Sequence, residues 1–369
     1  MLLAIDIENY RSLRSFRAEL AQLNVIVGEN GVGKTNVYQA LHLIAAASQG
    51  RFVETMAAEG GLPSVKWAGP TGPKRTRKNP PFRMRFAVEF DDLCYRLAIG
   101  FPPLSDHPPI RDEWLFSDDP HVKEELVWPR AARERSFLFK RTNNLLQARD
   151  ERGAIVDYPL SIASWEIGLA ELREPNQFPE LHVMHNRLAR WRFYHGFRSD
   201  AEAPARQARI GFHSPVLHED GGNLAAALRT IQEIGDIETL DSAIADAFDG
   251  ARLLIRKTDD LRFHLSLDVP GLFRPLQAHE LSDGQIRFLC LAAALLSPRP
   301  PSFMVFNEPE ASLHEHLLPT VARLVLAAAK NSQVCLTTHS TTLASELGRA
   351  GNPLLLQLIK RGGETMLDE

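Results

Sequence analysis

The residues with the most specific spacing form a glycine-rich turn, GENGVGKT, from Gly28 to Thr35. The turn fits the pattern G-x-x-x-x-G-K-[ST] and lies between an apolar segment and a helical pattern, the context that a phosphate-binding loop requires. Glycines permit a tight turn whose N–H groups point inward, and the following helix N-terminus adds partial positive charge. Lys34 can place a full charge on the phosphates, and the Thr35 hydroxyl can ligate Mg²⁺. The alternative is a chance glycine-rich turn. The predicted nucleotide-binding residues are Gly28, Glu29, Asn30, Gly31, Val32, Gly33, Lys34, Thr35 and Asn36.

A second set of candidate residues lies in VFNEPEASLH, far along the chain. The apolar run 303–306 predicts a buried strand, and Asn307 and Glu308 follow at its carboxyl end. Ligands bind at this end of the strands in open α/β sheets. Glu308 is therefore a candidate general base that polarises an attacking water. The alternative for Glu308 is a surface carboxylate after a core strand.

Two further stretches place polar groups where an anion could bind. ELSDGQ opens a predicted helix at 282–296, with Ser282 as its N-cap and Gly284 as bare backbone in the first turn. The alternative is an ordinary capped helix. QVCLTTHS predicts a buried strand that ends near His339. A histidine there is commonly structural, but beside a phosphate it could hydrogen-bond both the phosphate and the water.

The elements that must position these residues are short apolar strands alternating with helices. Strands are predicted at 2–7, 23–27, 302–306 and 333–337, and helices at 282–296 and 316–329. This alternation predicts an α/β fold with a parallel sheet covered on both faces. The middle of the chain departs from it, with strands between 82 and 158 and helices at 163–172 and 180–197. We therefore predict a core of 1–48 and 206–369, with 49–205 as an inserted elaboration.

Composition excludes several other classes of protein. The 369 residues carry 42 Lys+Arg and 46 Asp+Glu, so the net charge of −4 argues against a globally basic nucleic-acid-binding protein. No apolar run approaches the roughly 18 residues that a membrane span needs. The three cysteines have no zinc or disulfide spacing. We expect a soluble, reduced, cytoplasmic protein without a membrane partner.

Taken in order, these motifs resemble those of ABC-type ATPases. GENGVGKT resembles the Walker A loop, ELSDGQ the signature, VFNEPE the Walker B motif, EASLH the D-loop and TTHS the switch-histidine loop. The opening IENYRSLRSF and the stretch EPEASLH further resemble the branch of RecF and structural maintenance of chromosomes (SMC) proteins. WRFYHGFRSDAEAPAR and DGGNLAAAL are similar to a bacterial group of stand-alone AAA ATPases related to the overcoming-lysogenisation-defect ATPases. The resemblance implies a P-loop, ABC-type head with an inserted β-rich and helical elaboration.

The same resemblance implies an ATPase that works as an ATP-dependent homodimer with Mg²⁺. Lys34, Glu308 and His339 would be catalytic in cis, and Mg²⁺ would be held by Thr35 and, through a water, by Asn307. The signature would act in trans on the partner's nucleotide through Ser282, Asp283, Gly284 and Gln285. Hydrolysis would let the heads part. The implied setting is DNA repair, recombination or phage defence, with DNA or a separate effector protein as partner.

Three departures from the family pattern bear on activity. Asn307 replaces the usual Walker B aspartate and brings no charge, and a unit charge pair at 4 Å is worth roughly 4 kcal/mol at an effective dielectric constant of ~20. Slow turnover is one expectation; a nucleotide-gated module that regulates an effector such as a nuclease is the alternative. Asp283 replaces a glycine and brings a carboxylate toward the phosphate site. The Q-loop glutamine is unassigned, since neither Gln147 nor Gln177 has persuasive flanks.

Other clusters have two readings each. The basic run 74–78, with Arg83 and Arg85 nearby, could contact DNA phosphates or could be a solvated loop. Trp191, Phe193 and Tyr194 could stack on bases, but packing is the better expectation. His314 and His316 are not expected to bind a metal.

The energy-coupling subunit of a transporter is an alternative that fits this sequence poorly. The D-loop of such subunits differs from EASLH, and the spacing between their Walker A and signature motifs is shorter.

Overall fold

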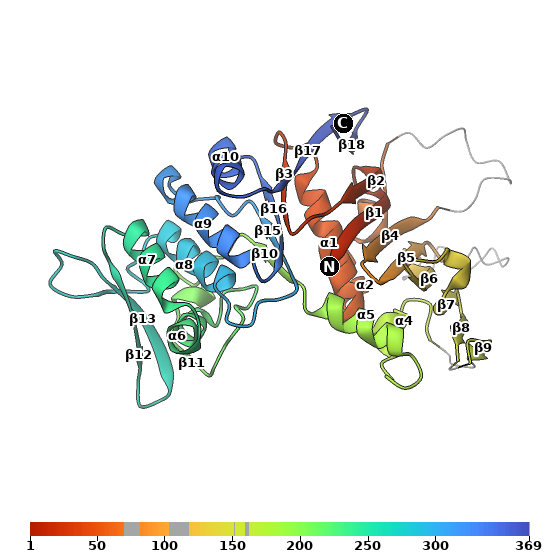
Figure 1. Cartoon of the computed structure of the whole chain (residues 1–369), viewed down its shortest axis with the longest axis horizontal. Helices are drawn as coiled ribbons and strands as arrows, with labels where there is room; N and C mark the ends of the chain where they lie inside the picture. The colour runs from red at the N-terminus through yellow and green to blue at the C-terminus, as the bar shows by residue number, and fades with distance from the viewer. Residues whose placement is uncertain (70–81, 103–117, 151, 159–161, 369) are drawn as a thin grey trace. The chain divides into compact units, whose positions relative to one another are not determined.

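The computed structural model describes residues 1–69, 82–102, 118–150, 152–158 and 162–368, and they form two compact units (Figure 1). Unit 1 comprises Met1–Ala21, Gly28–Trp191 and Leu356–Glu369. Unit 2 comprises Gln22–Val27 and Arg192–Leu355. The core and insertion boundaries expected from the sequence stay a prediction. Within the described residues, no helix is long and apolar enough to span a membrane.

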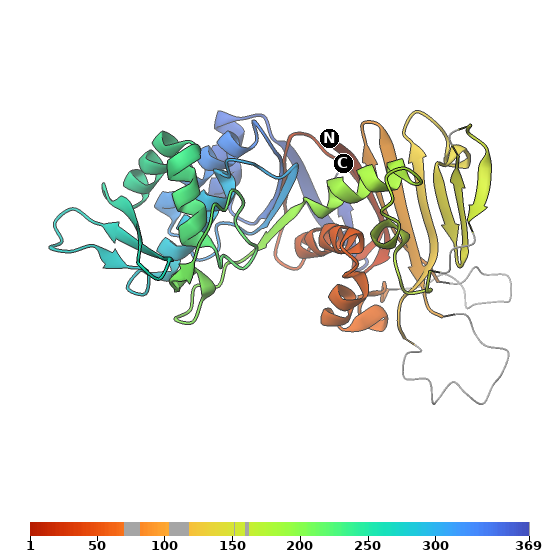
Figure 2. The same cartoon turned by 90° about the horizontal axis from the view of Figure 1, so that it is seen from below.

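Unit 1 is built on an eight-stranded antiparallel sheet in the order β2-β1-β4-β5-β6-β7-β8-β9 (Figure 2). The strands are β1 (Leu2–Tyr10), β2 (Leu13–Glu19), β4 (Met84–Phe90), β5 (Leu93–Gly100), β6 (His121–Pro129), β7 (Phe139–Thr142), β8 (Leu145–Arg149) and β9 (Ile155–Tyr158). In β4, buried residues alternate with half-buried ones, as expected for a strand with one face on the core. Turns at Asp91 and Asn143 connect neighbouring strands, β4 to β5 and β7 to β8.

Helices and a second hairpin complete unit 1. The helices are α1 (Lys34–Ser48), α2 (Phe52–Ala58), α3 (Gly61–Val65), η2 (Glu134–Ser136), α4 (Gly168–Glu171) and α5 (Pro179–Ala189). Nearly every residue of α1 from Val37 onward is buried, and the helix packs against α2 and α5. The hairpin of β17 (Leu354–Arg361) and β18 (Glu364–Leu367) brings the last described residues alongside β2. The sequence analysis predicted neither of its strands.

Unit 2 contains a parallel sheet in the order β10-β15-β16-β3. The strands are β10 (Arg192–His195), β15 (Phe303–Asn307), β16 (Gln333–Thr338) and β3 (Leu23–Val27). Every residue of β15 and β16 is buried, as expected for parallel strands whose two faces are both covered. In register, His195 lies beside Asn307 and Asn307 beside Thr337, so the carboxyl ends of three strands meet at one edge.

Unit 2 also contains five α-helices and a smaller sheet (Figure 1). The helices are α6 (Leu224–Ile234), α7 (Ile237–Ala247), α8 (Asp283–Leu295), α9 (Leu318–Ala328) and α10 (Thr341–Ala350), with the turns η3 (Pro204–Arg206) and η4 (Glu315–Leu317). The smaller sheet holds β11 (Arg209–Ile210), β12 (Arg252–Lys257), β13 (Arg262–Asp268) and β14 (Leu276–Gln277). Buried apolar residues of α6, α7, α8 and α9 pack with those of the strands in one hydrophobic cluster. The predicted α/β fold, with a parallel sheet covered by helices, is confirmed.

The helix expected at 180–197 is wrong in its second half. Helix α5 ends at Ala189, and 192–195 form β10, which pairs in parallel with β15. Phe193 and Tyr194 are adjacent and both buried, so the period-two alternation that identifies a half-exposed strand is lost. The side chains of Trp191, Phe193 and Tyr194 are only 1% to 3% exposed. This confirms the expectation that these rings pack inside the protein. The helix expected at 163–172 is reduced to the single turn α4.

Candidate functional site

The predicted site residues fall into two groups, one in each unit. The loop 28–36 belongs to unit 1. Residues 282–285, Asn307, Glu308 and His339 belong to unit 2.

The loop between β3 and α1 turns tightly because of its glycines. Gly28, Gly31 and Gly33 have φ values of 157°, 77° and 116°, a region that side chains with a Cβ rarely adopt. A Cβ on Gly33 would also lie 2.2 Å from Thr365 Oγ1. Both the backbone conformation and this close approach to the hairpin β17–β18 therefore require glycine at position 33.

The loop presents polar groups that suit a phosphate. Among the described residues, the N–H groups of Gly31, Gly33, Lys34 and Thr35 have no hydrogen-bond acceptor. They precede or begin a 15-residue helix, whose N-terminus favours an anion. The Lys34 side chain folds over the loop, and its Nζ donates to the carbonyl oxygens of Gly28 at 2.7 Å and Glu29 at 3.0 Å. The Thr35 side chain is exposed, so its hydroxyl is open to a metal ligated by phosphate oxygens.

In unit 2, Asn307 is fixed between two neighbouring strands. Its side chain is buried, Oδ1 accepts from Thr337 Oγ1 at 2.9 Å, and Nδ2 lies 2.9 Å from His195 Nδ1. Because the amide nitrogen can only donate, His195 accepts at Nδ1. The amide oxygen keeps a second lone pair, which fits a water bound to Mg²⁺. The sequence analysis missed His195, because its strand was taken for a helix.

Glu308 follows in a strained backbone conformation. Its φ of 49° is in the left-handed region, which non-glycine residues seldom occupy outside turns and functional sites. Its N–H is held by the Thr337 carbonyl oxygen at 3.0 Å, and its side chain is 32% exposed. His339 Nδ1 lies 3.6 Å from Glu308 Oε1. The structure thus brings together two of the predicted catalytic residues, Glu308 and His339, with the Glu308 carboxylate accessible.

Glu310 is a further residue of this site that the sequence analysis did not single out. Its Oε1 accepts from Thr338 Oγ1 at 2.6 Å and from the His339 N–H at 3.1 Å, and it lies 3.4 Å from His339 Nδ1. Its Oε2 is buried and has no hydrogen-bond partner within the described part of the chain. Glu310 therefore holds the end of β16 and the backbone of His339. Within EASLH it looks like a surface carboxylate, so no sequence signal marks it.

The signature stretch forms the N-terminus of α8, with Ser282 as N-cap as predicted. Ser282 Oγ accepts from the Gln285 N–H at 3.2 Å, and the Ser282 N–H donates to Gln285 Oε1 at 2.8 Å, which completes a capping box. The Ser282 hydroxyl proton is not used by this cap and can be donated to a ligand. A Cβ on Gly284 would lie 3.1 Å from the Ser312 carbonyl oxygen, so the D-loop passes close to the signature.

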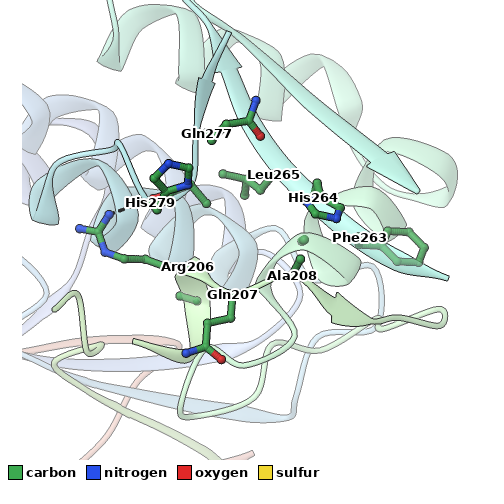
Figure 3. A pocket seen from close by; sticks show the side chains of 11 residues that line it. Arg206, Gln207, Ala208, Phe263, His264, Leu265, Gln277 and His279 are labelled. Carbon is green, nitrogen blue, oxygen red and sulfur yellow. Dashed lines mark hydrogen bonds between the residues drawn. The ribbon is translucent and has the colours of Figure 1, made fainter. Parts of the chain in front are cut away.

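Arg206 anchors the segment that leads into α8 (Figure 3). Its side chain, 7% exposed, donates to the carbonyl oxygens of Ser199 at 2.8 Å, Ala278 at 2.9 Å and Leu281 at 2.6 Å, and to Asp283 Oδ1 at 2.9 Å. The Asp283 carboxylate, which seemed to bring repulsion toward a phosphate, is therefore paired with an arginine. A hollow of about 50 Å³ lies beside Arg206, lined also by His264 and His279.

Other sequence candidates lie apart from these groups or outside the described residues. Gln147 Nε2 donates to Asp157 Oδ1 in the β8–β9 hairpin, and Gln177 lies in the turn before α5. Arg85 forms an ion pair with Glu8 at 2.6 Å. The basic run 74–78 falls outside the described residues. Across the described ranges, no group of three or more His, Cys, Asp or Glu side chains could hold a metal ion. His314 and His316 therefore belong to no such group.

Comparisons with known proteins bear on the family and on the fold of the chain. A family model described as "AAA domain, putative AbiEii toxin, Type IV TA system" matches residues 23–345. The solved structure of an SMC head bound to the C-winged helix domain of ScpA has a TM-score of 0.52 at 14% identity, covering 100% of this chain and 96% of that one. An SMC head with an extended coiled coil, bound to the C-terminal domain of ScpA from Pyrococcus furiosus, has a TM-score of 0.49 at 14% identity, with 100% and 95% covered.

One curated relative matches over a short segment. The DNA replication and repair protein RecF of Marinomonas sp. (strain MWYL1) is 51% identical over 45 residues, which are 12% of this chain and 12% of that protein. The matched segment therefore spans a small part of the relative's length.

Proposed function

Because the chain belongs to this AAA-domain family, an ABC-type family related to RecF and SMC heads, we propose that it binds and hydrolyses ATP and that ATP joins two copies of the chain. The observation that carries the proposal is the loop 28–35, where unpaired N–H groups and Lys34 surround the N-terminus of α1. Such a loop can bind a triphosphate even with an amide in place of the Walker B carboxylate.

The proposed chemistry assigns one task to each residue. The loop N–H groups and Lys34 bind and orient the phosphates. Glu308 accepts the proton of the attacking water, and His339 hydrogen-bonds the terminal phosphate. Mg²⁺, when bound beside Thr35 and the water of Asn307, would neutralise charge on the phosphate oxygens. Glu310 and Thr337 keep His339 and Asn307 in place.

The proposed dimer follows from the signature. Ser282 can donate its hydroxyl proton while it caps α8, and the Gly284 backbone lies in the first turn of the same helix. An anion at this N-terminus would be stabilised, and the phosphate of a nucleotide bound to a second copy is the anion that we propose. ATP that contacts both copies favours the dimer by mass action, and hydrolysis removes that link.

The test compares single substitutions in the full chain. We expect Lys34→Ala to abolish ATP binding, measured by titration calorimetry. Glu308→Gln should retain ATP and elute in size-exclusion chromatography with light scattering at twice 41.3 kDa. The matched control is Glu346→Gln, because Glu346 is paired with Arg349 on α10 and carries no proposed role. A Glu308→Gln protein that binds ATP yet stays monomeric would contradict the dimer.

A second candidate function rests on Asn307. A nucleotide-gated module with little hydrolysis could regulate a separate effector, such as a nuclease, through bound ATP alone. Steady-state phosphate release distinguishes the two: turnover well above about one per minute, toward the ~10 s⁻¹ of a median enzyme, would rule the module out.

We place the function in DNA repair, recombination or phage defence, with DNA or an effector protein as partner. The match to RecF, a DNA replication and repair protein, supports the first setting, and the toxin–antitoxin description of the family supports the last. The SMC heads bound to ScpA illustrate a head with a separate protein partner. Co-purification of the Glu308→Gln chain with ATP would identify the nucleic acid or protein retained. Recovery of neither would argue against a stable partner of the ATP-bound form.

A further inference from the structure

A chain of hydrogen bonds connects the nucleotide loop to two distant parts of unit 1. Asn36 Nδ2 donates to Ser12 Oγ at 2.6 Å, Ser12 Oγ lies 2.6 Å from Thr365 Oγ1, and Thr365 Oγ1 donates to the Val32 carbonyl oxygen at 2.6 Å. The direction is fixed, because an amide nitrogen only donates and a carbonyl oxygen only accepts. Ser12 must therefore donate to Thr365, and each hydroxyl makes one accepted and one donated bond.

We propose that Thr365 and Ser12 are positioning residues of the nucleotide loop, and that the hairpin β17–β18 fixes the loop conformation that phosphate binding requires. The inference deepens the proposed function and rests on it, because it assigns these residues to the same phosphate site. Thr365 lies in no motif identified from the sequence, and Ser12 lies in the opening IENYRSLRSF, where it was given no role.

The geometry of the peptide group explains how the positioning works. In a planar trans peptide, the C=O of one residue and the N–H of the next point in opposite directions. Thr365 holds the Val32 C=O toward the hairpin, so the N–H of Gly33 points away from the hairpin. That N–H is one of the loop donors without an acceptor. A bond on the outer side of the loop thereby aims a donor at the ligand side.

Other contacts from the same hairpin support the loop. The Thr365 side chain is fully buried and would be only 2.2 Å from a Cβ at Gly33. Lys360 Nζ donates to the Gly31 carbonyl oxygen at 3.0 Å. The Leu358 carbonyl oxygen would lie 2.9 Å from a Cβ at Gly28. The hairpin thus contacts the loop at its beginning, middle and end.

The test removes the Thr365 hydroxyl without changing the size of the side chain. Thr365→Val leaves the Val32 carbonyl without its donor and Ser12 without its acceptor. We expect the Kd for Mg-ATP, measured by titration calorimetry on the full chain, to rise by about tenfold, which corresponds to 1.4 kcal/mol. Thr365→Ser keeps the hydroxyl and should bind within about threefold of the wild type. If turnover is measurable, KM should rise while kcat stays within about twofold.

The matched control is Thr230→Val in unit 2. Thr230 is also a buried threonine with one donated and one accepted bond, to the Ala226 carbonyl and from the Ser214 N–H. It should lower the thermal unfolding midpoint without ATP much as Thr365→Val does, yet leave ATP affinity unchanged. Equal loss of affinity in the two variants would reduce Thr365 to a general stabilising role and overturn the inference.

The remaining outcomes are also distinguishable. If the wild type binds no ATP, the proposed function itself fails. If the wild type binds ATP and Thr365→Val binds it equally well, only the inference fails. If Thr365→Val does not fold, Ser12→Ala breaks the same chain one bond earlier at a half-buried position. Its affinity should then fall about threefold, and an unchanged Kd would overturn the inference.

Discussion

Asn307 stands where the Walker B motif usually has an aspartate. The two side chains have the same shape, but asparagine lacks the negative charge. The amide is held at one end by Thr337 and at the other by His195, so it is a built part of the sheet edge. An aspartate could keep both contacts, because Thr337 would still donate and His195 can carry its proton on Nδ1. The position therefore tolerates either side chain, and the difference between them is one negative charge.

This difference can be measured directly. Asn307→Asp should lower the Mg²⁺ concentration for half-maximal ATPase activity by at least about tenfold, since a charge pair at 4 Å is worth roughly 4 kcal/mol at an effective dielectric constant of ~20. The measurement is phosphate release against Mg²⁺ concentration. Asn331→Asp, which adds the same charge at an exposed position before β16, is the control and should have no effect. An unchanged Mg²⁺ requirement would place Asn307 away from the metal.

Sequence reasoning can propose site residues only where the signal is a local pattern. Lys34, Ser282 and Glu308 stand in short stretches whose spacing is itself the signal. Arg206 and Glu310 were missed because most of their partners are groups, such as backbone carbonyl and N–H groups, that only the fold brings near. An arginine whose side chain is buried and donates to three carbonyl oxygens looks, in the sequence, like any surface arginine.

At the scale of elements, helix α8 depends on support from outside the helix. Its capping box satisfies the first turn, and Arg206 fixes the turn before it through the carbonyl oxygens of Ala278 and Leu281. The same guanidinium pairs with Asp283, whose side chain is 63% exposed. The buried bonds and the exposed pair should therefore differ in their contribution to stability.

Two substitutions separate these contributions. Arg206→Met keeps the apolar stem but removes the donors, and should lower the free energy of unfolding by about 2–3 kcal/mol, because buried acceptors lose a charged donor. Asp283→Asn removes only the exposed ion pair and should cost less than about 1 kcal/mol. Urea unfolding of both variants gives the comparison. Equal losses would mean that Arg206 acts through Asp283 alone.

The elements themselves were predictable where the pattern was strong. Strand β3 was predicted with its observed bounds, because Leu23 to Val27 is bounded by a turn and a glycine loop. Strand β10 was missed since buried neighbours on both faces remove the alternation. The hairpin β17–β18 was also missed, although Lys360 and Thr365 in it donate to carbonyl oxygens of the nucleotide loop.

At the scale of the whole molecule, three buried thiols can be used to follow the unfolding of each unit separately. Cys94 lies in β5 of unit 1, and Cys290 and Cys335 lie in α8 and β16 of unit 2. Burial raises the pKa of the Cys94 thiol to about 11 and that of Cys335 to about 12, and it raises the pKa of Cys290 as well. All three should stay protonated and covered at neutral pH.

Thiol labelling tests this arrangement. Because the thiolate is the reactive form, the native protein at pH 8 should react with iodoacetamide at least about a hundredfold more slowly than the unfolded chain at each cysteine. Mass spectrometry of peptides labelled at increasing urea concentration then follows Cys94 separately from Cys290 and Cys335. Separate midpoints would indicate that the units unfold independently. Rapid labelling of any cysteine in the native protein would contradict the described packing.

The contact between Thr365 and Val32 can form only late in the synthesis of the chain. The two residues are 333 positions apart, and a ribosome adds about 5–20 residues per second. Roughly 20–70 s therefore pass between the synthesis of the loop and that of the threonine that fixes it. During that interval a nascent chain would hold ATP only weakly, so the ligand would stabilise finished molecules rather than growing ones.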